Sequence, residues 1–207
     1  MKKFLVLSFL FVRFTTVLHS QINKGSILLG GNVGFNNNKV KDTDKKSNSV
    51  SISPGIGIAV KQNTVMGINL AYSHFKSTYD SPNSETENNL YGGSVFVRRY
   101  LTLGKGFFLF GEADIYYQTS NNTYSYTGGK NEQKGWSTGI YIYPGLSYAV
   151  SKRFYLETGL PQLANLGFSK SKSISNGITE ESEGMNFNVS AGSLSTINLG
   201  FRIFFAK

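Results

Sequence analysis

The sequence contains no cysteine and only four prolines among its 207 residues. Without cysteine we expect neither a disulfide framework nor a lipid-anchored N-terminus. Beyond the N-terminal segment there is no run of about 20 apolar residues, which argues against helical membrane spans. Charged residues make up only 16% of the chain.

Glycine and aromatic residues are abundant, with 23 Gly, 12 Tyr and 16 Phe. The segment Tyr91–Tyr117 contains two runs of period-2 alternation, separated by Gly104-Lys105-Gly106. Such a break between two alternating runs predicts a tight β-hairpin. With the turn centred on Lys105, Arg98 and Glu112 lie opposite each other on the more charged face, so we predict that they are in contact.

The same alternation recurs along the whole chain and predicts eight strands. The face opposite the apolar one is built from small and polar residues, whereas a soluble barrel would place large apolar side chains inside. We therefore predict an all-β fold, an eight-stranded antiparallel up-and-down transmembrane β-barrel. The predicted strands are Gly25–Phe35, Ser49–Val60, Met66–Tyr79, Val95–Leu103, Phe107–Tyr117, Trp136–Val150, Phe154–Leu160 and a last strand that ends near Phe205.

Short and long connections alternate between these strands. Short turns are predicted near 61–64, 104–106 and 151–153, and long polar loops near 36–48, 80–89, 119–134 and 169–184. This asymmetry is typical of bacterial outer-membrane barrels, whose turns are short on the periplasmic side and longer outside. An even number of strands would place both termini in the periplasm.

Proline predicts where the strands are irregular. Because proline cannot donate to a ladder, we expect a bulge or a missing bond at Pro54 and Pro144, and a bulge near Pro161. The last strand is expected to break near Gly192-Ser193, where two small residues interrupt the alternation.

The N-terminus has two lysines followed by an apolar run and small residues, which predicts a secretory signal peptide over 1–20 and a single barrel domain over 21–207. The formal net charge is +9, to which Lys2, Lys3 and Arg13 of the signal peptide contribute three positive charges. The remaining lysines are scattered through predicted loops without interleaved aromatics, so nucleic-acid binding is not expected.

Three segments carry a resemblance to a known family: Phe96-Val97-Arg98, FFLFGEA from Phe107, and PGLSYAVSKRFYLET from Pro144. They resemble the outer-membrane β-barrel domain proteins common in Bacteroidetes, a porin family similar to the eight-stranded transmembrane part of outer-membrane protein A. The resemblance implies the fold and a location in the outer membrane. It implies little about activity, because one fold hosts many functions.

The alternation places five charged residues in the barrel interior. One hypothesis is that they form a selectivity cluster in a pore. The favoured one is a packed core of paired charges, because an eight-stranded barrel is only wide enough for its own side chains. The five residues are Arg98, Glu112, Asp114, Glu157 and Arg202.

No catalytic, cofactor or metal site is predicted. The histidine beyond the predicted signal peptide, His74, has the phase of the lipid-facing residues, and the adjacent Ser73 points the other way. Asp42-x-Asp44 lacks the remaining ligand spacing of a calcium site and is interpreted as part of a solvated loop.

We therefore expect a non-enzymatic outer-membrane protein with a structural or surface-interaction role through its four outer loops. The alternatives are a narrow passive pore and, with less support, a lipid-modifying enzyme that uses His74. Outer-membrane lipids and lipopolysaccharide are the expected partners, no cofactor is expected, and a monomer is predicted.

Overall fold

The computed structural model describes residues 22–40, 45–79, 83–175, 178–189 and 198–205. The predicted signal peptide, the Asp42-x-Asp44 pair and the predicted break near Gly192-Ser193 lie outside these ranges. The described residues form ten strands: β1 (Ile27–Val40), β2 (Lys45–Lys61), β3 (Thr64–Tyr79), β4 (Ser84–Gly104), β5 (Phe107–Tyr126), β6 (Gly129–Ala149), β7 (Phe154–Gly159), β8 (Ala164–Ser175), β9 (Ile178–Val189) and β10 (Asn198–Phe205). In these ranges no helix is long and apolar enough to cross a membrane.

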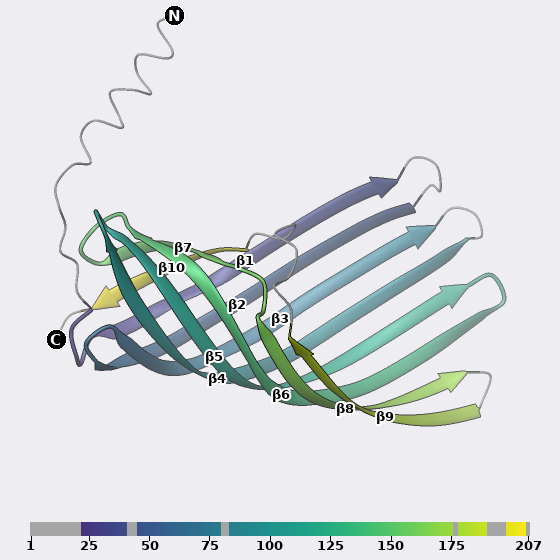
Figure 1. The fold of residues 1–207 in the computed structure, drawn as a ribbon. Helices are drawn as coiled ribbons and strands as arrows, with labels where there is room; N and C mark the ends of the chain where they lie inside the picture. Colours follow the sequence, from purple (N-terminus) through teal and green to yellow (C-terminus); the bar gives the residue numbers. More distant parts are fainter. Residues whose placement is uncertain (1–21, 41–44, 80–82, 176–177, 190–197, 206–207) are drawn as a thin grey trace, which may run out of the picture.

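Eight of the strands form a closed antiparallel ring. Its order is β5-β4-β3-β2-β1-β10-β7-β6, and the pairing of β6 with β5 closes it. The prediction of an eight-stranded antiparallel barrel is therefore confirmed. Figure 1 shows the hairpins reaching away from the end of the barrel at which β1 begins, β10 ends and the short turns lie.

The hairpin β8–β9 extends the sheet beyond this ring. Strands β7 and β8 follow one another along the same edge of β6. Strand β7 pairs with residues 145–149 of β6, and β8 pairs with residues 132–142. The register of β8 is offset by two residues from that of β7, so Leu160–Leu163 form the bulge expected near Pro161. The N–H groups of Leu160 and Leu163 still donate to the carbonyls of Pro144 and Ile142, at 2.9 and 2.8 Å.

Pro54 and Pro144, where a bulge or a missing bond is also predicted, interrupt the sheet less. The ladder between β2 and β3 passes from Ile52 to Gly55 without a pair at Pro54, and the register on both sides is the same. At Pro54 the ladder thus lacks a pair, as expected, but there is no bulge. Pro144 pairs with Gly111 of β5 and lies where β6 exchanges β7 for β8 as its neighbour.

The prediction of four long loops is wrong. Most of their residues continue the strands, with β1 reaching Val40, β3 Tyr79, β5 Tyr126 and β8 Ser175 before the chain returns. A run of polar residues excludes a strand only where one face of the strand must be buried. Both faces of these extensions are accessible to water, so their strands need no apolar residues. Cross-strand ion pairs support them, such as Lys76–Glu85 and Lys170–Glu183, each at 2.8 Å. Hydrogen bonding to Glu183 raises the pKa of Lys170, as expected for an ammonium held by carboxylates.

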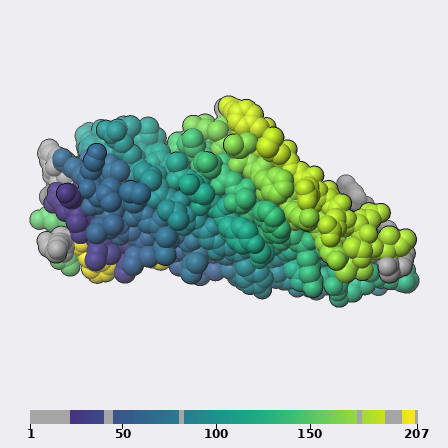
Figure 2. All heavy atoms as spheres, turned by 90° about the horizontal axis from the view of Figure 1, so that it is seen from below, coloured from purple at the N-terminus to yellow at the C-terminus, as the bar shows by residue number. Residues whose placement is uncertain are grey.

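The barrel is inverted relative to a soluble protein. Large apolar side chains cover its outer wall, whose elongated surface Figure 2 shows with β8–β9 along one margin. The inner face carries aromatics near the short turns and small or polar residues farther away. The buried core consists of Ile22, Leu28, Ala59, Val65, Phe96, Tyr100, Phe108, Phe110, Ala149, Tyr155 and Phe204.

Inward glycines leave space for these aromatic rings. We therefore predict that a Gly→Ala change lowers the free energy of unfolding at such positions and not elsewhere. A Cβ at Gly145 would collide with the ring of Phe110 and lie 2.6 Å from the carbonyl oxygen of Thr158. We expect Gly145→Ala to lower the free energy of unfolding by about 1–3 kcal/mol, the usual cost of overpacking. Urea unfolding of the refolded barrel measures this.

The matched control is Gly111→Ala, where an added Cβ meets no heavy atom of the described structure within 4 Å. This variant should unfold at the urea concentration of the unmodified protein. Equal destabilisation by both changes would contradict the packing assigned to the inner wall.

Candidate functional site

Aromatic side chains fill the lumen next to the short turns. Tyr100 lies at their centre, with its ring 5.9–6.2 Å from those of Phe108, Phe110 and Phe204. Tyr155 packs against Phe108 and Phe204 at 5.7 and 5.0 Å. These residues come from β4, β5, β7 and β10, so the layer is held from opposite sides of the ring. We call these five residues the aromatic floor.

An ion network lies directly on this floor, with Arg98 at its centre. The Arg98 guanidinium donates to Glu112 and Glu157, and its side chain is 2% exposed. Its Cζ lies 4.3 Å from the centroid of the Phe110 ring, a cation–π distance. Tyr100 donates through its hydroxyl to Glu157 at 2.8 Å. The network therefore connects β4, β5 and β7 across the lumen.

Arg202 completes the charge balance from β10. Its Nε lies 3.3 Å from Glu157, and its Nη1 donates to the carbonyl of Gly31 at 2.9 Å. The hydroxyl of Tyr143 donates to Glu112. Two guanidinium groups thus face two carboxylates, and each carboxylate accepts more than one hydrogen bond. This satisfies the condition under which buried charges are tolerated.

The strand period explains how the sequence builds this network. In the β4–β5 ladder Arg98 is the direct partner of Glu112, as predicted from the position of the turn. In the β10–β7 ladder Glu157 is opposite Gly200. In the β1–β10 ladder Arg202 is opposite Gly30, where an added Cβ would lie 2.6 Å from Cδ of Arg202, so the missing side chain of Gly30 leaves room for the arginine. The pairing of Glu157 with Arg98, across the lumen, is not contained in any single hairpin.

Asp114, the fifth residue of the predicted cluster, lies apart from the two arginines. It is fully buried and accepts a hydrogen bond from the hydroxyl of Ser94 at 2.6 Å. Its other oxygen has no hydrogen-bond partner among the described residues. A buried carboxylate with one unsatisfied oxygen contributes little or negatively to stability.

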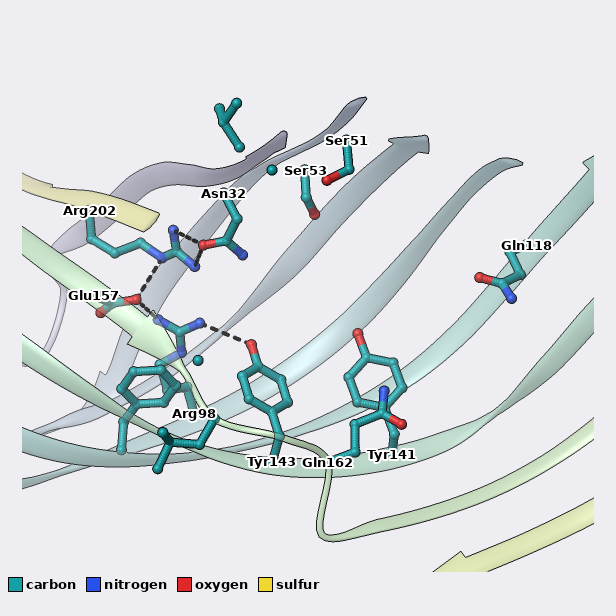
Figure 3. A pocket seen from close by; sticks show the side chains of 15 residues that line it. Asn32, Ser51, Ser53, Arg98, Gln118, Tyr141, Tyr143, Glu157, Gln162 and Arg202 are labelled. Carbon is teal, nitrogen blue, oxygen red and sulfur yellow. Dashed lines mark hydrogen bonds and ion pairs between the residues drawn. The ribbon is translucent and has the colours of Figure 1, made fainter. Parts of the chain in front are cut away.

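A cavity of about 370 Å³ opens on the other side of the ion network. Figure 3 shows Arg98, Glu157 and Arg202 at one end, with Asn32 and Ser53 facing Tyr143, Tyr141 and Gln162 across the space. A second cavity of about 210 Å³ adjoins it and shares six of these lining residues, namely Asn32, Ser53, Gln118, Tyr141, Tyr143 and Gln162.

Sequence analysis did not single out these uncharged lining residues. The signal was present for those on strands, because Asn32, Ser53 and Gln118 share the inward phase that the alternation assigns. Gln162 lies in the interruption between β7 and β8, where a period-2 pattern gives no direction. Its place in the cavity depends on the bulge and could not be predicted.

His74 lies on the outer wall, in the phase of Tyr72, as expected. Its Nδ1 is 2.9 Å from Oδ1 of Asn89 and 3.8 Å from Oε1 of Glu87, both on β4. Ser73 occupies the opposite phase of the strand. Within the described ranges, no group of three His, Cys, Asp or Glu residues could hold a metal ion.

The ion network predicts unequal costs for removing its carboxylates. Glu157→Gln leaves Arg98 and Arg202 with one fewer negative partner in a buried site, so we expect a loss of about 3–5 kcal/mol in the free energy of unfolding. Asp114→Asn should cost far less, because the amide keeps an acceptor for Ser94 and removes a poorly satisfied charge. Urea unfolding of both variants measures the difference. A larger loss for Asp114→Asn would refute this assignment of partners.

No protein-family model matches the sequence, and no curated protein matches it. Solved structures resemble the chain at low sequence identity. A major outer membrane protein from Thermus thermophilus is 8% identical, with a TM-score of 0.48 over 90% of this chain and 100% of the other. The N-terminal β-barrel domain of Pseudomonas aeruginosa OprF is 16% identical, with a TM-score of 0.38 over 88% and 98%. Neisserial surface protein A is 15% identical, with a TM-score of 0.40 over 87% and 97%. At these values the likeness carries no argument about activity.

Proposed function

We propose that the chain is an integral outer-membrane β-barrel protein without enzymatic activity or a conducting lumen. The observation that carries the proposal is the apolar outer wall, on which large side chains are exposed all round the ring. Ile56, Ile68, Val95 and Ile115 are 47–60% exposed. Such a continuous apolar surface is unfavourable in water and suits hydrocarbon.

Two belts of aromatic residues bound this surface. Near the short turns, the rings of Phe107 and Tyr148 are 4.6 Å apart. Toward the hairpin extensions, Tyr117 and Trp136 stack at 6.1 Å. Phe107 and Tyr117 are ten residues apart on β5, so at the rise and tilt of barrel strands they are separated by roughly 25 Å along the membrane normal. This agrees with the height of the apolar band in outer-membrane barrels.

Beyond the second belt the outward residues become charged. On β6 the series continues from Trp136 to Lys134, Glu132 and Lys130. Charge of this kind is expensive in hydrocarbon and favourable next to lipid headgroups and in water. We therefore infer that the hairpin extensions lie outside the cell and that the short turns, with both termini, face the periplasm.

The aromatic floor and the ion network support a closed barrel, because they fill the lumen from opposite strands. A structural or surface-interaction role then falls to the hairpin extensions, which replace the predicted loops as the contact surface. Lipids and lipopolysaccharide are the proposed neighbours, and the protein is proposed to be a monomer. The Bacteroidetes-type family remains a proposal from the sequence resemblance.

A narrow pore is the second candidate, because the cavity beyond the ion network already occupies part of the lumen. It would require the aromatic floor to open. The lipid-modifying enzyme has less support, since the side-chain partners of His74 are an amide and a carboxylate rather than a hydroxyl nucleophile.

Trp136 is the single tryptophan of the chain and reports membrane insertion directly. In vesicles of brominated lipid its fluorescence should be quenched more by bromines close to the headgroups than by bromines near the chain ends, because it belongs to the outer aromatic belt. Trp136→Phe with Phe168→Trp moves the probe to a neighbouring position of the same belt and should give the same depth. Absence of quenching in refolded protein would instead support a soluble barrel.

Single-channel recording tests whether the lumen conducts. The inserted protein should be silent, because Tyr100 lies at the centre of the aromatic floor and hydrogen-bonds to Glu157 of the ion network. Tyr100→Ala should produce openings, whereas Tyr100→Phe keeps the ring and should remain silent. Steady conductance of the unmodified protein would overturn the closed barrel in favour of the pore.

A further inference from the structure

We propose that the two adjoining cavities form one binding site for a neutral polyhydroxylated ligand, a saccharide, which enters from the side of the hairpin extensions. The inference goes beyond the structural role argued above. It starts from the volumes of about 370 and 210 Å³ and from the six residues that both cavities share. Cavities of several hundred cubic ångströms are the usual size of small-molecule sites.

The charges of the site argue against a charged ligand. Among the described residues, four charged side chains line the two cavities, and all four belong to the ion network: Arg98, Glu112, Glu157 and Arg202. Two positive and two negative groups offset one another within the wall. A charged ligand would lose its hydration without gaining an unpaired counter-charge.

The uncharged part of the lining argues against an apolar ligand. The side-chain amides of Gln118 and Gln162 make no hydrogen bond with any described residue. Asn32 accepts from Arg202 through Oδ1, which leaves its NH₂ group available as a donor. An apolar ligand would cover these groups and leave them unsatisfied, at a cost that a polar ligand avoids.

A neutral, polar ligand is therefore favoured, and a saccharide matches the side chains that line the site. Each amide offers a donor and an acceptor side by side, which suits neighbouring hydroxyl groups that can play both roles. The wall opposite Asn32 carries a ladder of tyrosines, with the rings of Tyr116 and Tyr143 at 5.5 and 5.9 Å from that of Tyr141. Tyrosine combines an apolar ring, against which C–H groups of a sugar can pack, with a polar hydroxyl.

The approach to the site has the same character. Several inward positions of the extensions carry hydroxyl side chains, for example Ser49 on β2, Ser120 on β5 and Ser171 on β8. The opposite end is blocked by the ion network and the aromatic floor. We therefore assign ligand entry and exit to the end of the extensions, as expected for a binding site rather than a passage.

Calorimetric titration of the refolded protein tests the proposal. Lauryldimethylamine oxide is the suitable detergent, because maltoside detergents carry sugar headgroups that would compete. The probes are maltotriose, cellotriose and chitotriose, with trigalacturonate as a charged analogue. We expect at least one neutral trisaccharide to bind and trigalacturonate to bind much more weakly.

Two variants locate the binding. Gln118→Ala and Gln162→Ala should each weaken it about two- to tenfold, the effect of losing one or two hydrogen bonds. The matched control is Gln133→Ala, an inward glutamine of β6 that donates to Ser171 at 3.2 Å and does not line the cavities. It should leave the affinity unchanged. Because Gln162 lies between strands and is exposed, its variant tests the site even if Gln118→Ala fails to fold.

Three results would overturn the proposal. These are no binding of any neutral trisaccharide, equally tight binding of trigalacturonate, or affinities that neither glutamine variant changes. The assay is performed in detergent and does not depend on conductance, so its outcome is separate from that of the proposed closed barrel.

Discussion

The narrow lumen of an eight-stranded ring is the constraint on which the rest of the structure depends. Every second residue of each strand points into this space, so the interior must be filled by side chains that fit together. Near the short turns the fit is achieved by large aromatics and inward glycines, as at Phe110 and Gly145. Arg98 can lie above them because two carboxylates reach it from different strands. Removing these carboxylates would leave a buried guanidinium without compensation.

The same constraint explains why the lumen becomes hollow farther from the turns. There the inward side chains of β1 and β2 shrink to Gly, Ser and Asn, as in Ser51 and Ser53 of β2 or Asn32 of β1, and they leave a space in front of the tyrosines on the facing wall. The cavity is thus a consequence of residue size along an otherwise regular pattern. The charged residues that line the cavity belong to the ion network at its base, so the rest of the described lining is uncharged.

The fold and the contact between Arg98 and Glu112 could be predicted from the sequence because both depend on period-2 alternation and on the position of a turn. The partner of Arg98 across the lumen could not, since Glu157 is distant in sequence and the closure of the ring alone brings it near. The extensions were mistaken for loops, because a strand wetted on both faces loses the alternation that identifies strands. Gln162 was missed because the bulge around Pro161 sets its direction.

The two ends of the barrel differ, because the lumen is packed near the short turns and hollow toward the hairpin extensions. The aromatic floor and ion network depend on contacts between β4, β5, β7 and β10, so they close the barrel where its ring is complete. The extensions depend mainly on ladders between consecutive strands and on exposed ion pairs such as Lys76–Glu85, which contribute little each. Rigidity is therefore concentrated at one end, while solvent access and chemical variety lie at the other. In a membrane this polarity would leave one accessible face, so any ligand of the interior would have to be an external one.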